Sequence, residues 1–275
     1  LIMKGPIGIF DSGYGGLTVL KSIQDLMPEY DCLYLGDNAR APYGTRSFEV
    51  INQYTYEAVE YLFSKNCPLI ILACNTSSAK ALRNIQQNKL SKYYPTKKVL
   101  GVIRPTTEEI GRFSKSGYIG IMGTAGTVVS NSYPIEIAKF FPNVHVVQQS
   151  CPMWVPLVEN NSFNEEGGQY YIQKYIAELL EKEPRIDTIV LACTHYPLLK
   201  PSIEKYLPIG VNLFDQGNLI AQKLIDYLKK HTDTDRQILR NGNVDILTTE
   251  ASDKFDGHLN LFYDTKNKSR TVQII

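Results

Sequence analysis

Two of the five cysteines in this 275-residue chain lie in segments that repeat. Cys74 ends the run Ile-Ile-Leu-Ala-Cys, and Cys193 ends the nearly identical run Ile-Val-Leu-Ala-Cys. The other cysteines are expected to be small buried apolar residues, because an odd cysteine count without a secretion signal argues against disulfides. A thiolate and a thiol on opposite faces of a carbon can remove a proton and return one with inversion. The repeat therefore suggests proton-transfer chemistry.

A second pair of matching segments accompanies the cysteines. Residues 7–13 read Ile-Gly-Ile-Phe-Asp-Ser-Gly, and residues 119–124 read Ile-Gly-Ile-Met-Gly-Thr. Ser12 in the first segment corresponds to Thr124 in the second, and Asp11 corresponds to Gly123. Two matches in the same order predict an internal duplication.

The repeated segments are short apolar runs with β-branched residues, which is typical of strands buried in a parallel sheet. Strand and helix patterns alternate, as in an α/β fold. Strands are expected over residues 6–11, 32–36, 69–74, 98–103, 118–122, 144–148, 188–193, 211–214 and 244–248. Helices are expected over residues 15–27, 47–65, 76–90, 105–115, 131–140, 165–182, 198–206, 217–230 and 252–263, with a loop at 231–235.

The duplication predicts two similar parallel-sheet α/β domains related by pseudo-two-fold symmetry. The boundaries are expected to give a first domain of residues 1–97 plus 211–275 and a second domain of residues 98–210. Ligands in open α/β sheets bind beyond the carboxyl ends of the strands. We therefore expect the active site in the cleft between the domains, lined by one related turn from each.

The residues at these strand ends suit a two-base reaction. Asp11, Cys74, Thr124 and Cys193 all lie at the carboxyl ends of expected strands, so the two thiols would approach one small ligand from opposite sides if the two halves face each other across a cleft. Asp11 could exchange a proton with the first cysteine, and His195 could do so with the second.

An amino-acid α-hydrogen is only weakly acidic, and pyridoxal phosphate on a lysine is the usual solution. No phosphate cradle is paired with a suitable lysine, and no Cys/His spacing suits zinc, so we expect neither cofactor nor metal. A cofactor-free site needs dense hydrogen bonding to the substrate carboxylate and exclusion of water. Short donors suited to this are Ser12, Asn75, Thr76, Thr124 and Thr194.

The charge pattern excludes several classes of partner. The chain has 29 basic and 28 acidic residues, and no basic run is longer than two, which argues against nucleic-acid and membrane-surface binding. The longest apolar run, residues 69–74, is far shorter than the ~18 residues that span a bilayer. Without a signal-peptide pattern, we expect a soluble, cytoplasmic protein.

Several segments resemble the glutamate racemase family. The most specific are Gly-Ile-Phe-Asp-Ser-Gly-Tyr-Gly-Gly-Leu-Thr-Val at residues 8–19 and Leu-Ala-Cys-Thr-His-Tyr-Pro-Leu at residues 191–198. Others are Gly-Asp-Asn-Ala-Arg-Ala-Pro-Tyr-Gly at 36–44, Ala-Cys-Asn-Thr at 73–76, Gly-Val-Ile-Arg-Pro at 101–105, Val-Pro-Leu-Val-Glu at 155–159 and Asp-Gln-Gly at 215–217. The resemblance runs from about residue 6 to the C-terminus, in order.

This resemblance implies a cofactor-independent interconversion of L- and D-glutamate that supplies bacterial peptidoglycan synthesis. It implies that Cys74 takes the α-proton from D-glutamate and that Cys193 takes it from L-glutamate. Asp11 would assist Cys74, while His195, with Glu159 behind it, would assist Cys193.

The resemblance also assigns the remaining substrate contacts and a homodimer. Residues implied to hold the α-amino and α-carboxylate groups are Ser12, Asn75, Thr76, Thr124 and Thr194, with Asp11 beside them. Pro42, Tyr43 and Gly44 are implied to hold the side-chain carboxylate, partly through backbone N–H groups. Some members carry an N-terminal extension linked to activation by a UDP-muramoyl peptide precursor, and the few residues before Ile7 argue against such activation here.

Three other functions remain open from the residues alone. One is a two-thiol racemase of aspartate or another acidic amino acid. A second is a cysteine hydrolase with Cys74 as nucleophile and His195 as base, which leaves Cys193 without a role. A third is a solute-binding module, which needs no thiols. Structural interpretations also exist: Asp11 as a helix cap, and Asp37 with Arg40 as an ion pair that holds the Tyr43 loop.

Overall fold

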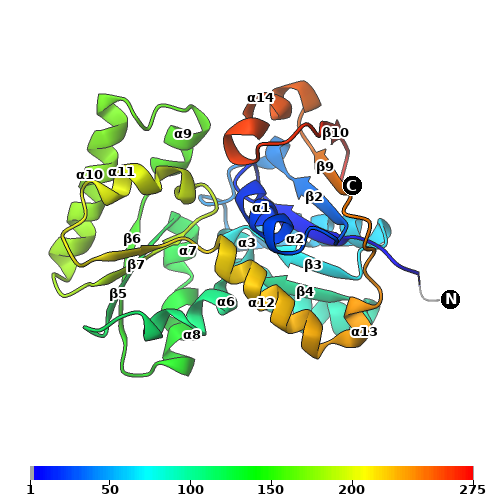
Figure 1. Cartoon of the computed structure of the whole chain (residues 1–275), viewed down its shortest axis with the longest axis horizontal. Helices are drawn as coiled ribbons and strands as arrows, with labels where there is room; N and C mark the ends of the chain where they lie inside the picture. Colours follow the sequence, from blue (N-terminus) through cyan, green and yellow to red (C-terminus); the bar gives the residue numbers. More distant parts are fainter. Residues whose placement is uncertain (1–2, 275) are drawn as a thin grey trace. The chain divides into compact units, whose positions relative to one another are not determined.

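A computed structural model describes residues 3–274 of the chain (Figure 1). Contacts divide the chain into two units. Unit 1 comprises the chain up to Val102 and from Gly217 onward, and unit 2 is Ile103–Gln216. Each unit is built on its own parallel sheet with helices between successive strands, which confirms the predicted α/β class.

Unit 1 contains a six-stranded sheet in the order β10-β9-β2-β1-β3-β4. Its strands are β1 (Ile7–Asp11), β2 (Cys32–Gly36), β3 (Leu69–Leu72), β4 (Lys98–Gly101), β9 (Val244–Thr248) and β10 (Ser269–Thr271). Every residue of β1, β2 and β3 is buried, as expected for strands covered on both faces. Helices therefore pack on both sides of this sheet.

Side chains alternate between the two faces of the unit 1 sheet. Phe10, Leu35 and Leu72 belong to a core cluster that also contains Val59 and Leu62 of helix α2. Outside this cluster, helix α1 packs against α12 and α14. The helices of unit 1 are α1 (Leu17–Leu26), η1 (Asn38–Arg40), α2 (Phe48–Ser64), α3 (Asn75–Lys80), α4 (Leu82–Asn84), the π-helix η2 (Ile85–Leu90), α5 (Ser91–Tyr93), α12 (Gly217–Lys230), α13 (Thr232–Asp235) and α14 (Ser252–Phe262).

Unit 2 contains a four-stranded sheet in the order β6-β5-β7-β8. Its strands are β5 (Tyr118–Gly123), β6 (His145–Ser150), β7 (Thr188–Ala192) and β8 (Asn212–Phe214). Its helices are α6 (Ile103–Thr107), η3 (Ile110–Arg112), α7 (Ala125–Val129), α8 (Ser132–Phe140), α9 (Trp154–Glu159), α10 (Glu166–Lys182), η4 (Tyr196–Leu199) and α11 (Lys200–Glu204). Strand β7 is buried throughout and carries Cys193 directly after its last residue.

The sheets of the two units share one topology. The order β2-β1-β3-β4 in unit 1 recurs as β6-β5-β7-β8 in unit 2. The sequence pair at residues 7–13 and 119–124 therefore falls on β1 and β5, and the cysteine-bearing pair falls on β3 and β7. Segments that match in sequence thus occupy equivalent strands, as a duplication requires.

The structure corrects the expected domain boundaries by a few residues at each crossover. The expected second domain, 98–210, would include β4 and exclude β8. However, Ile70 of β3 pairs with Val99 of β4, so β4 belongs to the first sheet. In the same way, Ile189 of β7 pairs with Leu213 of β8, so β8 belongs to the second sheet. Contacts within each unit place the two crossovers after Val102 and after Gln216.

Two local expectations were also wrong or incomplete. Residues 232–235, expected in a loop, form the short helix α13. Strand β10 was not expected, because Ser269, Arg270 and Thr271 carry no apolar pattern. Within residues 3–274, no helix combines the length and apolarity needed to cross a membrane.

We expect Ile121→Ala to lower the free energy of unfolding of unit 2 by about 2–5 kcal/mol, because Ile121 is fully buried in the central strand β5. Denaturant titration followed by the fluorescence of Trp154, the chain's single tryptophan, reports on this unit. The control is Ile135→Ala, since Ile135 is 51% exposed. Equal effects of the two substitutions would contradict the assigned core.

Candidate functional site

The first group of predicted site residues surrounds the end of β1. Asp11 is 1% exposed, and one of its carboxylate oxygens, Oδ2, accepts a hydrogen bond of 2.9 Å from the Gly13 backbone N–H. The Tyr34 hydroxyl donates to the Gly13 carbonyl at 2.7 Å and so stabilises the turn that follows β1. Gly16 lies so close that an added Cβ would be 2.4 Å from the Asp11 Cβ, so only glycine fits there. The turn thereby fixes the position of Asp11.

Cys74 follows β3 at the adjacent strand end of unit 1. Its sulfur lies 3.5 Å from the Ser12 hydroxyl, and it caps helix α3 by accepting a hydrogen bond of 3.5 Å from the Ser77 backbone N–H. The neighbouring β1 residue Phe10 pairs with Leu72, so the turns after β1 and β3 meet at one sheet edge. The thiol is 6% exposed.

Burial and a neighbouring carboxylate oppose ionisation of Cys74. Burial, followed by the negative charge of Asp11, raises the pKa of this thiol to about 11, against the lowering effect of hydrogen bonds from Ser12 and Ser77. A neutral thiol is therefore favoured in the protein without substrate. A positive charge brought by a ligand would favour the thiolate.

The loop over residues 37–44 is the third part of unit 1 with predicted site residues. Tyr43 is 1% exposed; its ring packs in the core and its hydroxyl donates to the buried Asp37 carboxylate. The Tyr43 side chain is therefore committed to the fold, and burial raises its pKa well above the ordinary value. The backbone N–H groups of Tyr43 and Gly44 meet no acceptor in the described part of the chain. At Tyr43 and Gly44, the backbone N–H groups rather than a side chain are therefore the groups that a ligand could bind.

Cys193 occupies the equivalent strand end in unit 2. Its sulfur lies 4.0 Å from Nδ1 of His195, and the Nε2 of the same ring lies 3.0 Å from the Glu159 carboxylate. An ionised carboxylate can only accept, so the Nε2 of His195 carries a hydrogen and donates to Glu159. Nδ1 then faces the thiol, where it can receive its proton.

Aromatic packing brings Glu159 to His195 from a distant part of the chain. Helix α9, which ends at Glu159, packs on η4, which follows His195. The Trp154 and Tyr196 rings meet edge to face with centroids 4.8 Å apart, and the Tyr196 hydroxyl donates to the Cys151 carbonyl at 3.1 Å. These contacts hold the carboxylate against the imidazole.

Electrostatics favour a protonated His195. Burial alone would lower the pKa of this imidazole, but the hydrogen bonds and negative charges of Cys193 and Glu159 outweigh burial and raise its pKa above the ordinary value. The two cysteines therefore differ: one faces a carboxylate and the other an imidazole.

Two predicted threonines complete the strand ends of unit 2. Thr124 follows β5 and caps helix α7, because its hydroxyl accepts a hydrogen bond of 3.3 Å from the Thr127 backbone N–H. Gly123 pairs with Ala192 in the sheet, so Thr124 and Cys193 follow neighbouring positions. Thr194, next to the cysteine, is 7% exposed.

Each unit thus gathers its own share of the predicted residues. Unit 1 holds Asp11, Ser12, Pro42, Tyr43, Gly44, Cys74, Asn75 and Thr76, and unit 2 holds Thr124, Glu159, Cys193, Thr194 and His195. Sequence analysis missed supporting residues at both strand ends, including Tyr34, Ser77 and Tyr196. These are common core or capping residue types; Tyr196 lies in the quoted segment 191–198, but nothing in that segment indicates its supporting contact.

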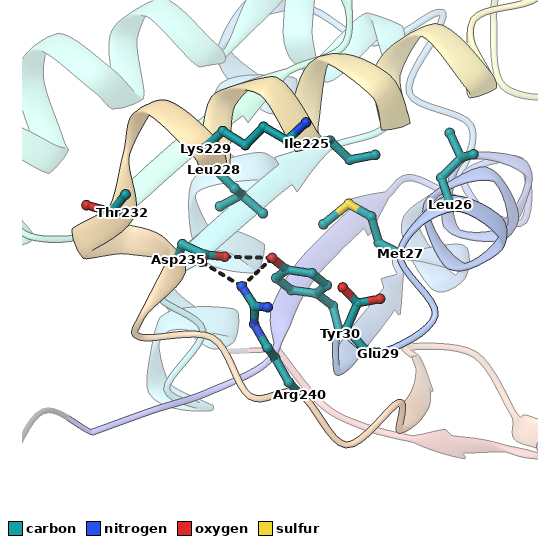
Figure 2. Close-up of a pocket in the computed structure, with 10 residues that line it drawn as sticks. All are labelled: Leu26, Met27, Glu29, Tyr30, Ile225, Leu228, Lys229, Thr232, Asp235 and Arg240. Atoms are coloured by element: carbon teal, nitrogen blue, oxygen red, sulfur yellow. Dashed lines mark hydrogen bonds and ion pairs between the residues drawn. The ribbon is translucent and has the colours of Figure 1, made fainter.

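A cavity of about 270 Å³ lies elsewhere in unit 1, between α1, α12 and α13 (Figure 2). None of the predicted site residues lines it. Three of its polar groups bind one another: the Tyr30 hydroxyl donates to Asp235 at 2.7 Å, and Arg240 donates to both at 2.6 Å. No cysteine lines this cavity. Residues 3–274 contain no cluster of three or more His, Cys, Asp or Glu side chains placed to hold a metal ion.

Comparison with known proteins identifies the family. The family model described as Asp/Glu/Hydantoin racemase matches residues 17–224. The chain belongs to this racemase family. A glutamate racemase of Streptococcus thermophilus is 40% identical over 77% of this chain and 75% of its own length, and one of Aquifex aeolicus is 38% identical over 91% of both. The crystal structure of a glutamate racemase isoform of Bacillus anthracis has a TM-score of 0.89 at 30% identity and covers 98% of both chains.

The Glu159→Gln substitution tests how this racemase-family protein tunes His195. We expect the pKa of His195 to fall toward its ordinary value of about 6.5, because the neutral amide no longer stabilises the imidazolium. NMR titration of the ring signals measures it, with His145, His231 and His258 as internal controls.

The same shift changes how stability depends on pH. A raised His195 pKa stabilises the folded state at pH below about 6.5, and this contribution is lost as the pH rises through the raised pKa. Between about pH 6.5 and the raised pKa, the free energy of unfolding should fall less in the Glu159→Gln variant than in the parent protein. An unchanged His195 titration would contradict the assigned pair.

Proposed function

We propose that this chain is a glutamate racemase that interconverts L- and D-glutamate with Cys74 and Cys193 as its two bases. The observation that carries the proposal is that equivalent strand ends, after β3 and β7, each bear a buried thiol with its own acid/base neighbour. Asp11 serves Cys74, and His195 with Glu159 serves Cys193. A hydrolase or a binding module would need only one such pair or none.

In the D-to-L direction, Cys74 acts as the base. The thiol first loses its proton to Asp11, and the positively charged α-ammonium group of the bound substrate favours the resulting thiolate. The thiolate takes the α-proton from D-glutamate, and the electron pair of the C–H bond remains on the α-carbon. Cys193 then delivers its proton to the opposite face, and its thiolate is stabilised by protonated His195.

The L-to-D direction uses the same groups in reverse. Cys193 takes the α-proton from L-glutamate, and Cys74 protonates the other face. Each turnover leaves the proton on the opposite cysteine, so the pair returns to its starting state through its neighbours, Asp11 and His195.

The remaining predicted residues bind the substrate. Side chains proposed to hold the α-amino and α-carboxylate groups are Asp11, Ser12, Asn75, Thr76, Thr124 and Thr194. The unengaged N–H groups of Tyr43 and Gly44, with Pro42 before them, are proposed to bind the side-chain carboxylate. A glutamate racemase of Francisella tularensis, 29% identical with a TM-score of 0.86, has been solved in complex with D-glutamate.

The product would serve peptidoglycan synthesis. We propose that the enzyme acts in the cytoplasm as a homodimer and without a bound cofactor, with proton removal and proton return carried out by the two thiols themselves. Aspartate remains the alternative substrate, and the relatives of about 40% identity, which are glutamate racemases, favour glutamate.

Replacing either cysteine by serine tests the two-base assignment. With Cys74→Ser or Cys193→Ser, we expect racemisation in both directions to fall by about a hundredfold to ten-thousandfold, because serine is a far weaker acid than cysteine. The measurement is circular dichroism of added L- or D-glutamate, with α-deuterium incorporation from D₂O, without pyridoxal phosphate. The control is Cys67→Ser, since this buried cysteine lies outside the site. Full activity with one cysteine replaced would exclude the mechanism.

Isotope effects test which neighbour serves which thiol. The equilibrium constant of racemisation is one, so any substitution must lower kcat/KM equally in both directions. What can differ between the two directions is which proton transfer limits the rate. With Asp11→Asn, we expect a larger isotope effect on α-deuterated D-glutamate and a smaller one on α-deuterated L-glutamate. With His195→Asn, we expect the opposite pattern. Identical patterns in both variants would contradict the assignment.

A further inference from the structure

Thr249 belongs to the C-terminal return, the part of the chain from Gly217 onward that completes unit 1 after unit 2. It lies beyond the residues 17–224 that the family model matches. It directly follows β9, whose last residue, Thr248, pairs with Gly36 at the end of β2. The Thr249 backbone N–H donates to the Gly36 carbonyl at 3.0 Å and so extends the strand pairing by one residue. This places the Thr249 side chain beside the loop over residues 37–44.

The Thr249 hydroxyl joins this loop at two points. It donates to Oδ1 of Asp37 at 2.8 Å, and it accepts a hydrogen bond of 3.0 Å from the backbone N–H of Ala39. A hydroxyl can do both at once because it is a donor and an acceptor. Valine has the same shape and can do neither.

Asp37 passes this constraint on to Tyr43. Its second oxygen, Oδ2, accepts from the Tyr43 hydroxyl and from Nε of Arg40 at 2.7 Å. The Asp37 backbone N–H also donates to the Asp11 carbonyl at 3.0 Å. Asp37 is fully buried, so its orientation depends on these partners rather than on water. The Asp37 carboxylate therefore links Thr249 to the segment with the unengaged N–H groups.

We propose that Thr249 is a positioning residue for the substrate's distal carboxylate. Through Asp37 and Ala39, it fixes the loop so that the N–H groups of Tyr43 and Gly44 point at one place. This inference rests on the proposed glutamate racemase function. It assigns a task in substrate selection to a residue of the C-terminal return.

The expected effect of losing Thr249 falls on binding rather than on chemistry. The distal carboxylate keeps its charge throughout the reaction, so contacts to it stabilise the bound substrate and the transition state alike. Loss of such contacts raises KM and leaves kcat unchanged. A general loss of structure would instead lower kcat and the melting temperature together.

Three variants test the proposal: Thr249→Val, Thr249→Ser and the matched control Thr271→Val. The Thr271 hydroxyl has the same bonding pattern in the same part of the chain, since it accepts from the Ser252 N–H at 3.0 Å and donates to the Glu250 carbonyl at 3.1 Å. It does not contact the loop. Steady-state kinetics in both directions gives KM and kcat, and hydrogen exchange measures the protection of the Ala39 amide.

We expect Thr249→Val to raise KM for glutamate about tenfold, the loss of roughly one hydrogen bond's contribution, and to speed exchange at Ala39. Thr249→Ser should restore both quantities, and Thr271→Val should change neither. An unchanged KM in Thr249→Val, or equal KM values in the valine and serine variants, would overturn the proposal. If Thr249→Val does not fold, Thr249→Ala gives the same comparison with serine.

Failure of the proposed function gives a different result. If the unaltered protein does not racemise glutamate, that function is wrong, whatever the variants do. The Ala39 exchange rates still decide whether Thr249 anchors the loop, because they need no turnover. Unaltered exchange at Ala39 in Thr249→Val would refute the anchoring even in an active enzyme.

Discussion

The free-energy cost of ionising a buried thiol determines which groups must surround Cys74 and Cys193 for either to act as a base. A sulfur at the end of a buried parallel strand is shielded from water, and burial favours its neutral form. Burial raises the pKa of Cys74 to about 11, with Asp11 adding to the effect. Such a thiol can act as a base only where neighbouring groups supply hydrogen bonds, positive charge or a proton acceptor. The turns around both strand ends supply these groups.

The two units solve this problem with different groups on one topology. Asp11 ends β1, whereas the matching position at the end of β5 is Gly123, which has no side chain. The missing acid/base group appears instead two residues after the second cysteine, where His195 corresponds to Thr76 of unit 1. Both units therefore carry a cysteine at the equivalent strand end, but the acid/base neighbour occupies a different position in each unit. In the proposed reaction, one thiol accepts a proton while the other donates one, and these roles exchange when the direction reverses.

Much of the fold could be predicted from the sequence because its strands are apolar and short. Strands β2 and β9 begin and end where the sequence pattern predicts, and the repeated strands were found from sequence alone. Strand β10 escaped because its polar residues occupy a sheet edge, where no core selects apolar side chains. Helix α9 escaped because it is short and contains Pro156.

The candidate site was predictable at the strand ends and less so elsewhere. Local motifs mark Cys74 and Cys193. In contrast, the burial of the Tyr43 side chain in the core and its hydrogen bond to Asp37 depend on the folded conformation of the loop. Thr249 is more than two hundred residues from Asp37 in the sequence, and their hydrogen bond follows only from the pairing of β2 with β9. Long-range contacts of this kind leave no local signal.

The discontinuous composition of unit 1 has a consequence for synthesis on the ribosome. Unit 2 is one continuous stretch, whereas β2 lacks its neighbour β9 until residues 244–248 have been translated. The nascent chain therefore presents an open strand edge during the whole elongation of unit 2, and such edges invite association with other chains. Protection by chaperones would be needed most in this interval, and a translational pause after unit 2 would prolong the exposure.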